Sequence, residues 1–295
     1  MQAMEPLHDA HPHGLAADLN TLAQRALARR GVLRWLAAGA AMAGPMGLIA
    51  CGGGGDADAG DNSSDNSDGG TSGSDTGSCS VIPSETAGPY PADGTNSNSD
   101  GTVNALAMTG IVRSDITPSF GDYGDNVAEG VPLTVTLKLV NTASSCTNLA
   151  GYAVYLWHCD RGGNYSLYSS DAAEENYLRG VQLSDSNGEV TFTTIFPACY
   201  SGRWPHMHFE VYSSIAEATS GNNDVKTSQL AMPSAACQQV YGVASGYDAS
   251  VSNFAQVSLS SDNVFSDDSA ALQLPTVQGS VSAGFTATLT VGIGA

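Results

Sequence analysis

A short segment in the second half of the chain carries the residues best suited to metal chemistry. The segment 199–211 contains two histidines two positions apart, His206 and His208, and Tyr200 and Arg203 lie just upstream of them. Because side chains alternate between the two faces of an extended strand, both imidazoles lie on one face, with Cα atoms roughly 6 to 7 Å apart. This spacing lets two rings bind one ion. The segment therefore predicts a metal site.

A structural interpretation of the same pattern is also open. A His-x-His pair on a strand is common, and alone it does not specify a metal. The positions between and after the histidines, Met207, Phe209 and Val211, are apolar and form the opposite face, which is typical of a core face. The histidine face then needs its own reason to be polar.

Tyrosines could supply that reason. A loop at 160–166 follows an apolar strand-like stretch and carries Tyr165, with Tyr168 close by. A phenolate is a hard, strongly donating ligand that favours a trivalent ion such as Fe(III), and imidazole completes a mixed nitrogen and oxygen set. Two histidines and two tyrosines would make a four-ligand ferric site, with Tyr200 as one phenol and Tyr165 or Tyr168 as the other.

Short strands must position these residues. Apolar and polar residues alternate over 133–140 and 285–293, and 151–159 is a more apolar strand. The stretch 181–195 reads as a hairpin because it centres on an Asn-Gly pair, which accepts the positive φ angles of a tight turn. No long helical period occurs within 79–295. The chain is therefore predicted to be all-β, as an antiparallel β-sandwich domain over residues 79–295.

The first 78 residues are predicted to be an export signal and a tether. Residues 1–50 contain the pair Arg29 and Arg30 followed by an apolar run that ends at Cys51, as in a Tat-type lipoprotein signal. A transmembrane anchor is the alternative, but the run is short and contains Pro45. Residues 51–78, rich in Gly, Ser and Asp after the lipidated Cys51, should be a disordered tether. The protein is thus expected to be exported and membrane-anchored, facing the periplasm or the cell exterior.

Charge and cysteine content narrow the function classes. The formal net charge is −19, which disfavours binding to nucleic acid or to an anionic bilayer surface except through a lipid on Cys51. Disulfides can form in an exported protein. With Cys51 assigned to the lipid, five cysteines remain, so at most two disulfides can form. Their pairing and the oligomeric state stay open. These cysteines are Cys79, Cys146, Cys159, Cys199 and Cys237.

Several motifs, in the same order, resemble those of the intradiol ring-cleavage dioxygenases, specifically their exported branch. They are ETAGPYP (85–91), VRSDI (112–116), WHCD (157–160), GNYS (163–166), LRG (178–180), TTIFP (193–197) and YSGRWPHMHF (200–209). The resemblance covers most of residues 79–295. It departs from the family at Ala198, Cys199 and Ser201, around the loop that carries Tyr200, which bears on substrate fit more than on metal binding.

The resemblance implies a non-haem Fe(III) enzyme that uses O2 to cleave a catechol-type aromatic diol to a muconate-type dicarboxylic acid. The implied metal ligands are Tyr165, Tyr200, His206 and His208. Tyr200 is also expected to act as a base, and Arg203 to stabilise charge that develops on the ring. Gln229 matches a glutamine near the oxygen-binding side.

Other interpretations remain at this point. A non-catalytic transthyretin-like or carbohydrate-binding β-sandwich would make the histidines structural, and a zinc hydrolase would use His206 and His208 alone. Arg203 could simply pair with Glu210 or with an acidic loop. We expect His158 to be a structural histidine, and Trp157 and Trp204 to be packing residues.

Overall fold

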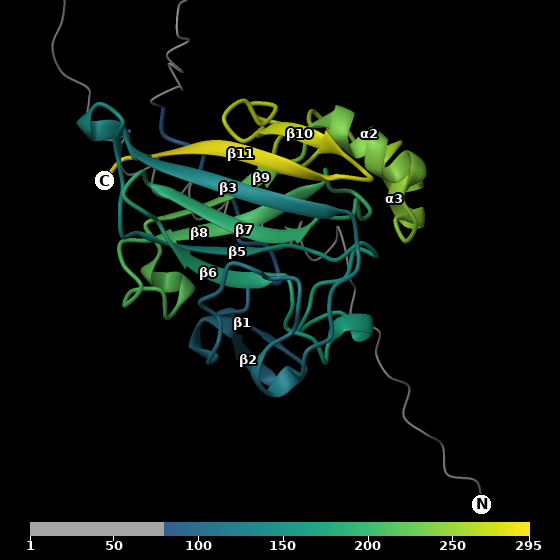
Figure 1. Cartoon of the computed structure of the whole chain (residues 1–295), viewed down its shortest axis with the longest axis horizontal. Coiled ribbons are helices and arrows are strands. Elements are labelled where there is room, and N and C mark those ends of the chain that lie inside the picture. The colour runs from purple at the N-terminus through teal and green to yellow at the C-terminus, as the bar shows by residue number, and fades with distance from the viewer. Residues whose placement is uncertain (1–79) are drawn as a thin grey trace, which may run out of the picture. The chain divides into compact units, whose positions relative to one another are not determined.

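A computed structural model describes residues 80–295 (Figure 1). The predicted signal at 1–50 and the whole predicted tether at 51–78, which begins with Cys51, therefore lie outside the described residues, as does Cys79. Within the described part, no helix is both long and apolar enough to cross a membrane.

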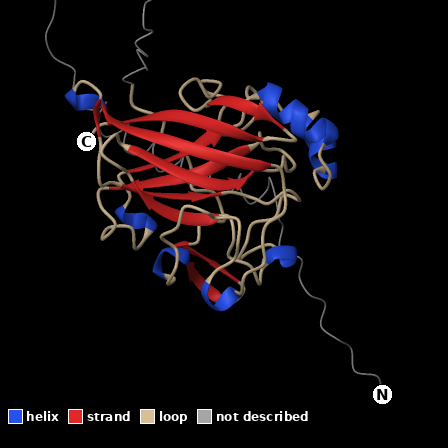
Figure 2. Cartoon of the chain, in the orientation of Figure 1, coloured by secondary structure: helices blue, strands red, loops and turns tan. Residues whose placement is uncertain are grey.

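Two β-sheets face each other and form the sandwich (Figures 1 and 2). One sheet has the order β10-β11-β3-β4, with β7 also paired to β3; the other has the order β6-β5-β8-β9, and β1 and β2 form a separate hairpin. The strands are β1 Asp93–Asn98, β2 Gly101–Asn104, β3 Pro132–Asn141, β4 Thr147–Asn148, β5 Ala153–Trp157, β6 Arg179–Leu183, β7 Glu189–Ile195, β8 His206–Tyr212, β9 Lys226–Ala231, β10 Thr276–Ser280 and β11 Gly284–Ile293. Short 3-10 turns occupy Ala105–Ala107, Gly121–Tyr123, Thr142–Ser144, Ser170–Ala172 and Gly221–Asn223.

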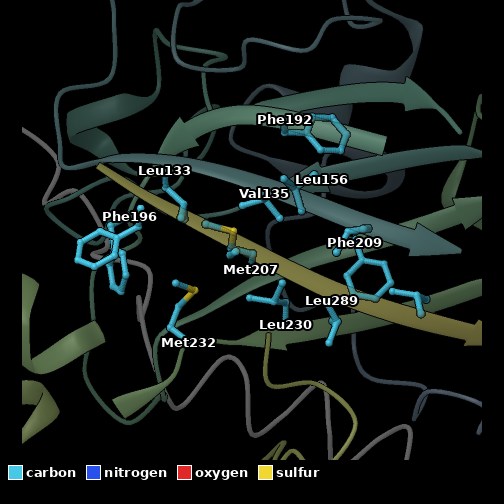
Figure 3. Close-up of a cluster of buried hydrophobic side chains, with 14 of the residues drawn as sticks. Leu133, Val135, Leu156, Phe192, Phe196, Met207, Phe209, Leu230, Met232 and Leu289 are labelled. Atoms are coloured by element: carbon cyan, nitrogen blue, oxygen red, sulfur yellow. The ribbon is translucent and has the colours of Figure 1, made fainter. Parts of the chain in front are cut away.

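The core lies between the two sheets. Alternate residues of β3, β7 and β11 meet Leu156 of β5, Met207 and Phe209 of β8 and Leu230 of β9 (Figure 3). These side chains are almost fully buried, so each contributes roughly 1.5 to 3 kcal/mol of transfer free energy. The odd-numbered residues of β8 therefore face the core, as the alternation predicted, and its histidines face away from it.

The face of the second sheet that carries the histidines is also covered. A second buried cluster joins Tyr155 and Trp157 of β5 and Tyr212 of β8 to segments that precede and follow the sandwich strands. Among the covering residues are Ala87 and Tyr165. Every residue of β8 is consequently buried, which places the histidines in an enclosed, weakly polar environment.

The prediction of an all-β sandwich is confirmed, with three differences in detail. The strands β3 and β11 pair in parallel, whereas all other strand pairs among the described residues are antiparallel. Two helices, α2 (Ser234–Val243) and α3 (Asp248–Phe254), lie near one end of the sandwich (Figure 2). They went unpredicted because each is short, although the buried residues of α2 lie at helical spacing, at Ala236, Cys237, Val240 and Tyr241.

The predicted hairpin at 181–195 is wrong, although its turn is right. Gly188 has a φ of +76°, and Asp185 accepts hydrogen bonds from the backbone of Asn187 and Glu189. However, β6 pairs with β5 in one sheet and β7 pairs with β3 in the other. The backbone oxygen of Gly188 accepts from Leu139 of β3, so this turn carries the chain between the sheets.

The cysteines of the described part fall into two groups. Cys146 is disulfide-bonded. Cys159, Cys199 and Cys237 are buried free thiols, and burial raises the pKa of each. Three buried thiols are compatible with the predicted limit of two disulfides.

Candidate metal centre

Four side-chain donor atoms converge on the covered face of β8. The His206 and His208 Nε2 atoms are 3.1 Å apart, and Tyr200 Oη is 3.1 Å from His206 Nε2. Tyr165 Oη is 3.3 Å from His208 Nε2 and 3.5 Å from Tyr200 Oη, which closes a ring of four atoms. We call these four side chains the donor ring.

The sheet holds the two histidines in place. His208 lies between Trp157 of β5 and Gln229 of β9 in the strand register. The Trp157 indole stacks on the His208 imidazole, with ring centroids 5.0 Å apart and planes 8° apart. On another side the backbone of Gly88 approaches so closely that a Cβ there would lie 3.2 Å from the His208 ring. The ring therefore has little freedom to turn.

A tight loop fixes Tyr165. The Asp160 carboxylate accepts hydrogen bonds from the backbone of Gly162 and Asn164, and Tyr165 N donates to Ser169 Oγ. Tyr165 is 2% exposed, and burial raises its pKa well above the ordinary range, with a further contribution from nearby Tyr200. A phenol held in this way needs a cation to ionise.

Tyr168, the alternative ligand, lies elsewhere. Its hydroxyl donates to Asn96 Oδ1 at 2.6 Å and accepts from Ala92 N at 2.9 Å. Both contacts anchor the start of the domain and lie outside the donor ring. Of the two tyrosines, the structure thus brings Tyr165 to the histidines.

Tyr200 is the least enclosed of the four donors. It is only partly buried, whereas the other three donors are almost completely buried. Its Cβ would be 3.3 Å from a Cβ on Gly163, which has a φ of +92°, so glycine there lets the two loops approach. Tyr200 has more room to move than Tyr165.

Burial and nearby positive charge keep the two imidazoles neutral. His206 Nδ1 lies 2.5 Å from the Trp204 carbonyl oxygen, which can only accept, so the proton is on Nδ1 and the Nε2 lone pair faces the donor ring. Burial lowers the pKa of His206 well below its ordinary value, and the Arg203 cation adds to this. Burial also lowers the pKa of His208, with further contributions from His206 and Arg203.

The donor ring fits a ferric ion. Ligands about 2.0 to 2.2 Å from one ion in a tetrahedral arrangement lie roughly 3.3 to 3.6 Å apart, close to the ring's separations of 3.1 to 3.5 Å. Two neutral imidazoles and two phenols form a mixed nitrogen and oxygen set suited to Fe(III). A bound cation would also turn the Nε2 lone pair of His206 from a crowded contact into a bond.

Arg203 does pair with an acidic residue, and it also borders the donor ring. Its Nε donates to Asp262 Oδ2 at 3.0 Å and its Nη2 to Gln229 Oε1 at 2.7 Å. Its Nη1 lies 3.5 Å from His206 Nε2. Gln229 Nε2 in turn donates to the Thr86 carbonyl at 2.8 Å. All the predicted site residues after Cys51 are therefore brought together.

Sequence reasoning missed two contributors. Asp262 lies in a Ser- and Asp-rich stretch that resembles many solvated loops, and nothing in its local pattern links it to Arg203. Gly88 belongs to the ETAGPYP motif, but only its contact with His208 explains why glycine is needed there. The motif itself was the available signal for Gly88.

The residues predicted to be structural behave as expected. His158 is buried and hydrogen-bonded through both ring nitrogens, and Trp204 Nε1 donates to the Met232 carbonyl. Within residues 80–295, no three His, Cys, Asp or Glu side chains gather closely enough to hold a metal ion.

Comparisons with known proteins bear on the fold and on the family resemblance. Residues 113–218 match a family model described as Dioxygenase. An intradiol ring-cleavage dioxygenase from Tetranychus urticae has a similar fold, with a TM-score of 0.55 and 24% identity over 73% of this chain and 95% of its own. A 3-chlorocatechol 1,2-dioxygenase from Rhodococcus opacus 1CP matches more weakly, with a TM-score of 0.42 and 16% identity over 70% of each chain. The family-model match confirms the resemblance that the motifs predicted, and the Tetranychus urticae structure confirms the fold.

Proposed function

We propose, from the premise that this chain is related to the intradiol ring-cleavage dioxygenases, that it is an Fe(III)-dependent dioxygenase. It would add both atoms of O2 to a catechol-type aromatic diol and cleave the ring between the two hydroxylated carbons, giving a muconate-type dicarboxylic acid. The observation that carries the proposal is the donor ring: two neutral imidazoles and two phenols within 3.1 to 3.5 Å of one another on a covered sheet face.

The donor ring would hold the iron through four side chains with two different tasks. When bound, Fe(III) supplies a Lewis acid that draws electron density from the diolate and opens a ring carbon to attack by O2. Tyr165 and the histidines are buried and held by their neighbours, so they suit permanent ligation. The ligands are Tyr165, Tyr200, His206 and His208.

Tyr200 is suited to receive the substrate's proton. A catechol must lose its hydroxyl protons to bind as a dianion, so a base is needed inside the covered site. Tyr200 Oη is next to His206 Nε2, and Tyr200 is less enclosed than Tyr165. Its phenolate oxygen would take one of the two protons from the incoming diol and turn away as a neutral phenol, and the other proton would be released to water.

Arg203 and Gln229 are suited to the negative charge that develops on the ring. The Arg203 guanidinium is buried, and its Nη1 faces the donor ring. A fixed cation in an enclosed site stabilises such charge without reorganising. Gln229 holds Nη2 of this guanidinium, so its expected role includes orienting Arg203.

A neutral diol is the favoured substrate. A carboxylate on the ring would need a cation to receive it, but Arg203 already pairs with Asp262. Arg179 is likewise committed, to the carbonyls of Tyr90, Pro91 and Ser166. An unsubstituted catechol has no carboxylate and therefore needs no further cation in the site.

Oxygen incorporation tests the reaction. The purified, iron-loaded protein should consume one O2 per catechol, and ¹⁸O2 should place one labelled atom in each carboxyl group of an open-chain dicarboxylic acid. A non-catalytic sandwich would consume no O2 above a His206→Ala control. An aldehyde-containing product would exclude cleavage between the hydroxylated carbons.

We further propose that the protein is exported and held at a membrane by a lipid on Cys51, with residues 51–78 as tether and 79–295 as the catalytic domain. The Arg29-Arg30 pair and the composition of 51–78 support this. Cys51→Ser should release active protein from the membrane fraction. If wild type and variant are equally soluble, the lipid anchor is wrong. Replacing Arg29 and Arg30 by Lys should block export of folded protein, and normal export would indicate another route.

A further inference from the structure

The Asp262 carboxylate forms an ion pair with Arg203, which belongs to the proposed catalytic machinery. It is fully buried and lies in the segment after α3, beyond the part of the chain that matches the family model. Its Oδ2 accepts from Arg203 Nε at 3.0 Å and from Trp204 N at 2.6 Å. Oδ2 thus accepts hydrogen bonds from the Arg203 guanidinium and from the backbone of the next residue, Trp204. These two bonds hold the guanidinium in place relative to the backbone beside it.

The second oxygen of Asp262 is equally occupied. Oδ1 accepts from the backbone of Val264 at 2.8 Å and of Phe265 at 3.1 Å. Four N–H donors therefore surround the carboxylate, which suits a fixed anion and leaves no role for it in proton transfer. The same turn places the Phe265 ring near His206, with centroids 6.4 Å apart, and 6.0 Å from the Arg203 guanidinium carbon.

The guanidinium is consequently held from two sides. Asp262 binds Nε and Gln229 binds Nη2, which directs Nη1 towards His206 Nε2 at 3.5 Å. Both members of the Arg203 and Asp262 pair are almost completely excluded from solvent, at 1% and 0% side-chain exposure. In such surroundings a cation without its anion would be strongly destabilised and would seek other partners.

We propose that Asp262 is a positioning residue of the ring-cleavage reaction, which holds the Arg203 guanidinium at the edge of the donor ring. This inference rests on the proposed function. Asp262 does not touch the donor ring itself, so it acts through Arg203. Its replacement should reduce turnover far more than iron binding, because Tyr165, Tyr200 and His208 keep their own supports and His206 keeps its bond to the Trp204 carbonyl, which Asp262 does not touch.

Kinetics of Asp262→Asn test this role. The substitution keeps the size of the side chain but removes its charge and one acceptor oxygen. We expect kcat to fall roughly 100-fold with KM and iron content within about threefold of wild type, since a misplaced catalytic group costs about that much. In an Arg203→Gln background the same change should cost less than about threefold, because the group it positions is already gone.

A matched control is Asp185→Asn. Asp185 also accepts two backbone N–H bonds in a turn, but it lies in the connection between the sheets. Its kcat should equal that of wild type. The positioning role is overturned if Asp262→Asn turns over like wild type, if it loses iron in proportion to activity, or if its effect is undiminished in the Arg203→Gln background.

A second measurement needs no activity and no Asp262 variant. In iron-free wild type, the Nε–H of Arg203 should give a slowly exchanging ¹⁵N NMR signal, because a buried carboxylate holds it. The described domain contains four arginines, so Arg203→Lys assigns the signal by its loss. Arg161, which pairs with Glu129 at the surface, is the internal reference. Exchange at Arg203 as fast as at Arg161 would overturn the inference.

Absence of colour and turnover in wild type would instead refute the proposed function, with the NMR result unaffected.

Discussion

The pocket of His158 and the donor ring both contain buried histidine, yet they differ in how the ring nitrogens are used. His158 Nδ1 contacts the Cys159 carbonyl at 2.8 Å, and its Nε2 contacts Thr194 Oγ1 at 2.7 Å. In the donor ring, the Nε2 atoms of His206 and His208 face each other and two phenols. Both ring nitrogens of His158 thus have hydrogen-bond partners within the protein. The donor ring instead gathers the lone pairs of its nitrogen and oxygen atoms around one point.

Burial alone does not separate these two kinds of histidine. His158 and His208 are each 2% exposed and His206 is 1% exposed, and burial is the largest cause of the lowered pKa in all three. The hydrogen-bond partners make the distinction, because a satisfied histidine needs nothing further. Metal binding should therefore respond to His206 and His208 and be indifferent to His158.

The largest predicted effect comes from removing a donor-ring histidine. His206→Ala or His208→Ala should lower iron affinity by more than about 100-fold, since even a supporting residue of a metal ligand is worth 10- to 100-fold. Turnover should disappear with the metal. The matched variant His158→Gln, which can donate and accept as His158 does, should keep its iron. Equal iron loss in all three variants would contradict the distinction between His158 and the two donor-ring histidines.

The next effect separates the two tyrosine ligands. Tyr200→Phe should retain much of its iron but lose roughly 100-fold or more in kcat, because it removes the proposed base. Tyr165→Phe should weaken iron retention and remove the larger share of the visible band that persists with substrate bound. Tyr168→Phe, whose hydroxyl serves Asn96 and Ala92, is the control. Loss of colour in Tyr168→Phe with colour kept in Tyr165→Phe would contradict the assignment.

The smallest effect concerns His158 and pH. Burial lowers the pKa of His158 from 6.5 to about 4, so between these values the unfolded chain binds a proton that the folded chain does not. The free energy of unfolding should therefore fall as pH falls through this window, by up to about 3 kcal/mol from this group. In His158→Gln this component should vanish, as denaturant titrations at pH 7 and pH 4 would reveal. Identical pH dependence in both proteins would contradict it.

Much of the arrangement around the donor ring follows from local sequence. Alternation in β3 and β11 follows from one buried face, and alternation in β8 correctly set which of its residues face the core, although both of its faces are buried. The motif match to GNYS indicated Tyr165, and the distances agree. The local pattern does not determine which strands pair with each other. At Gly188 the predicted turn forms, but the strands on either side of it, β6 and β7, join different sheets.

Long-range electrostatic partners were the other gap. Asp262 follows Arg203 by 59 residues, and only folding brings the two together. The helices α2 and α3 were missed because they are only ten and seven residues long. The burial of Tyr247 on the core similarly depends on contacts far away in sequence, including its hydrogen bond with the Phe196 carbonyl.

The visible absorption spectrum of the iron-loaded protein, before and after catechol is added without O2, tests the central claim most directly. Tyrosine phenolates bound to Fe(III) absorb visible light by charge transfer, so the protein should be red to burgundy and catechol should shift the band. His158→Gln should share this behaviour, and His206→Ala should be colourless. A wild-type protein that binds ferric iron but remains colourless, or whose band does not respond to catechol, would contradict the account.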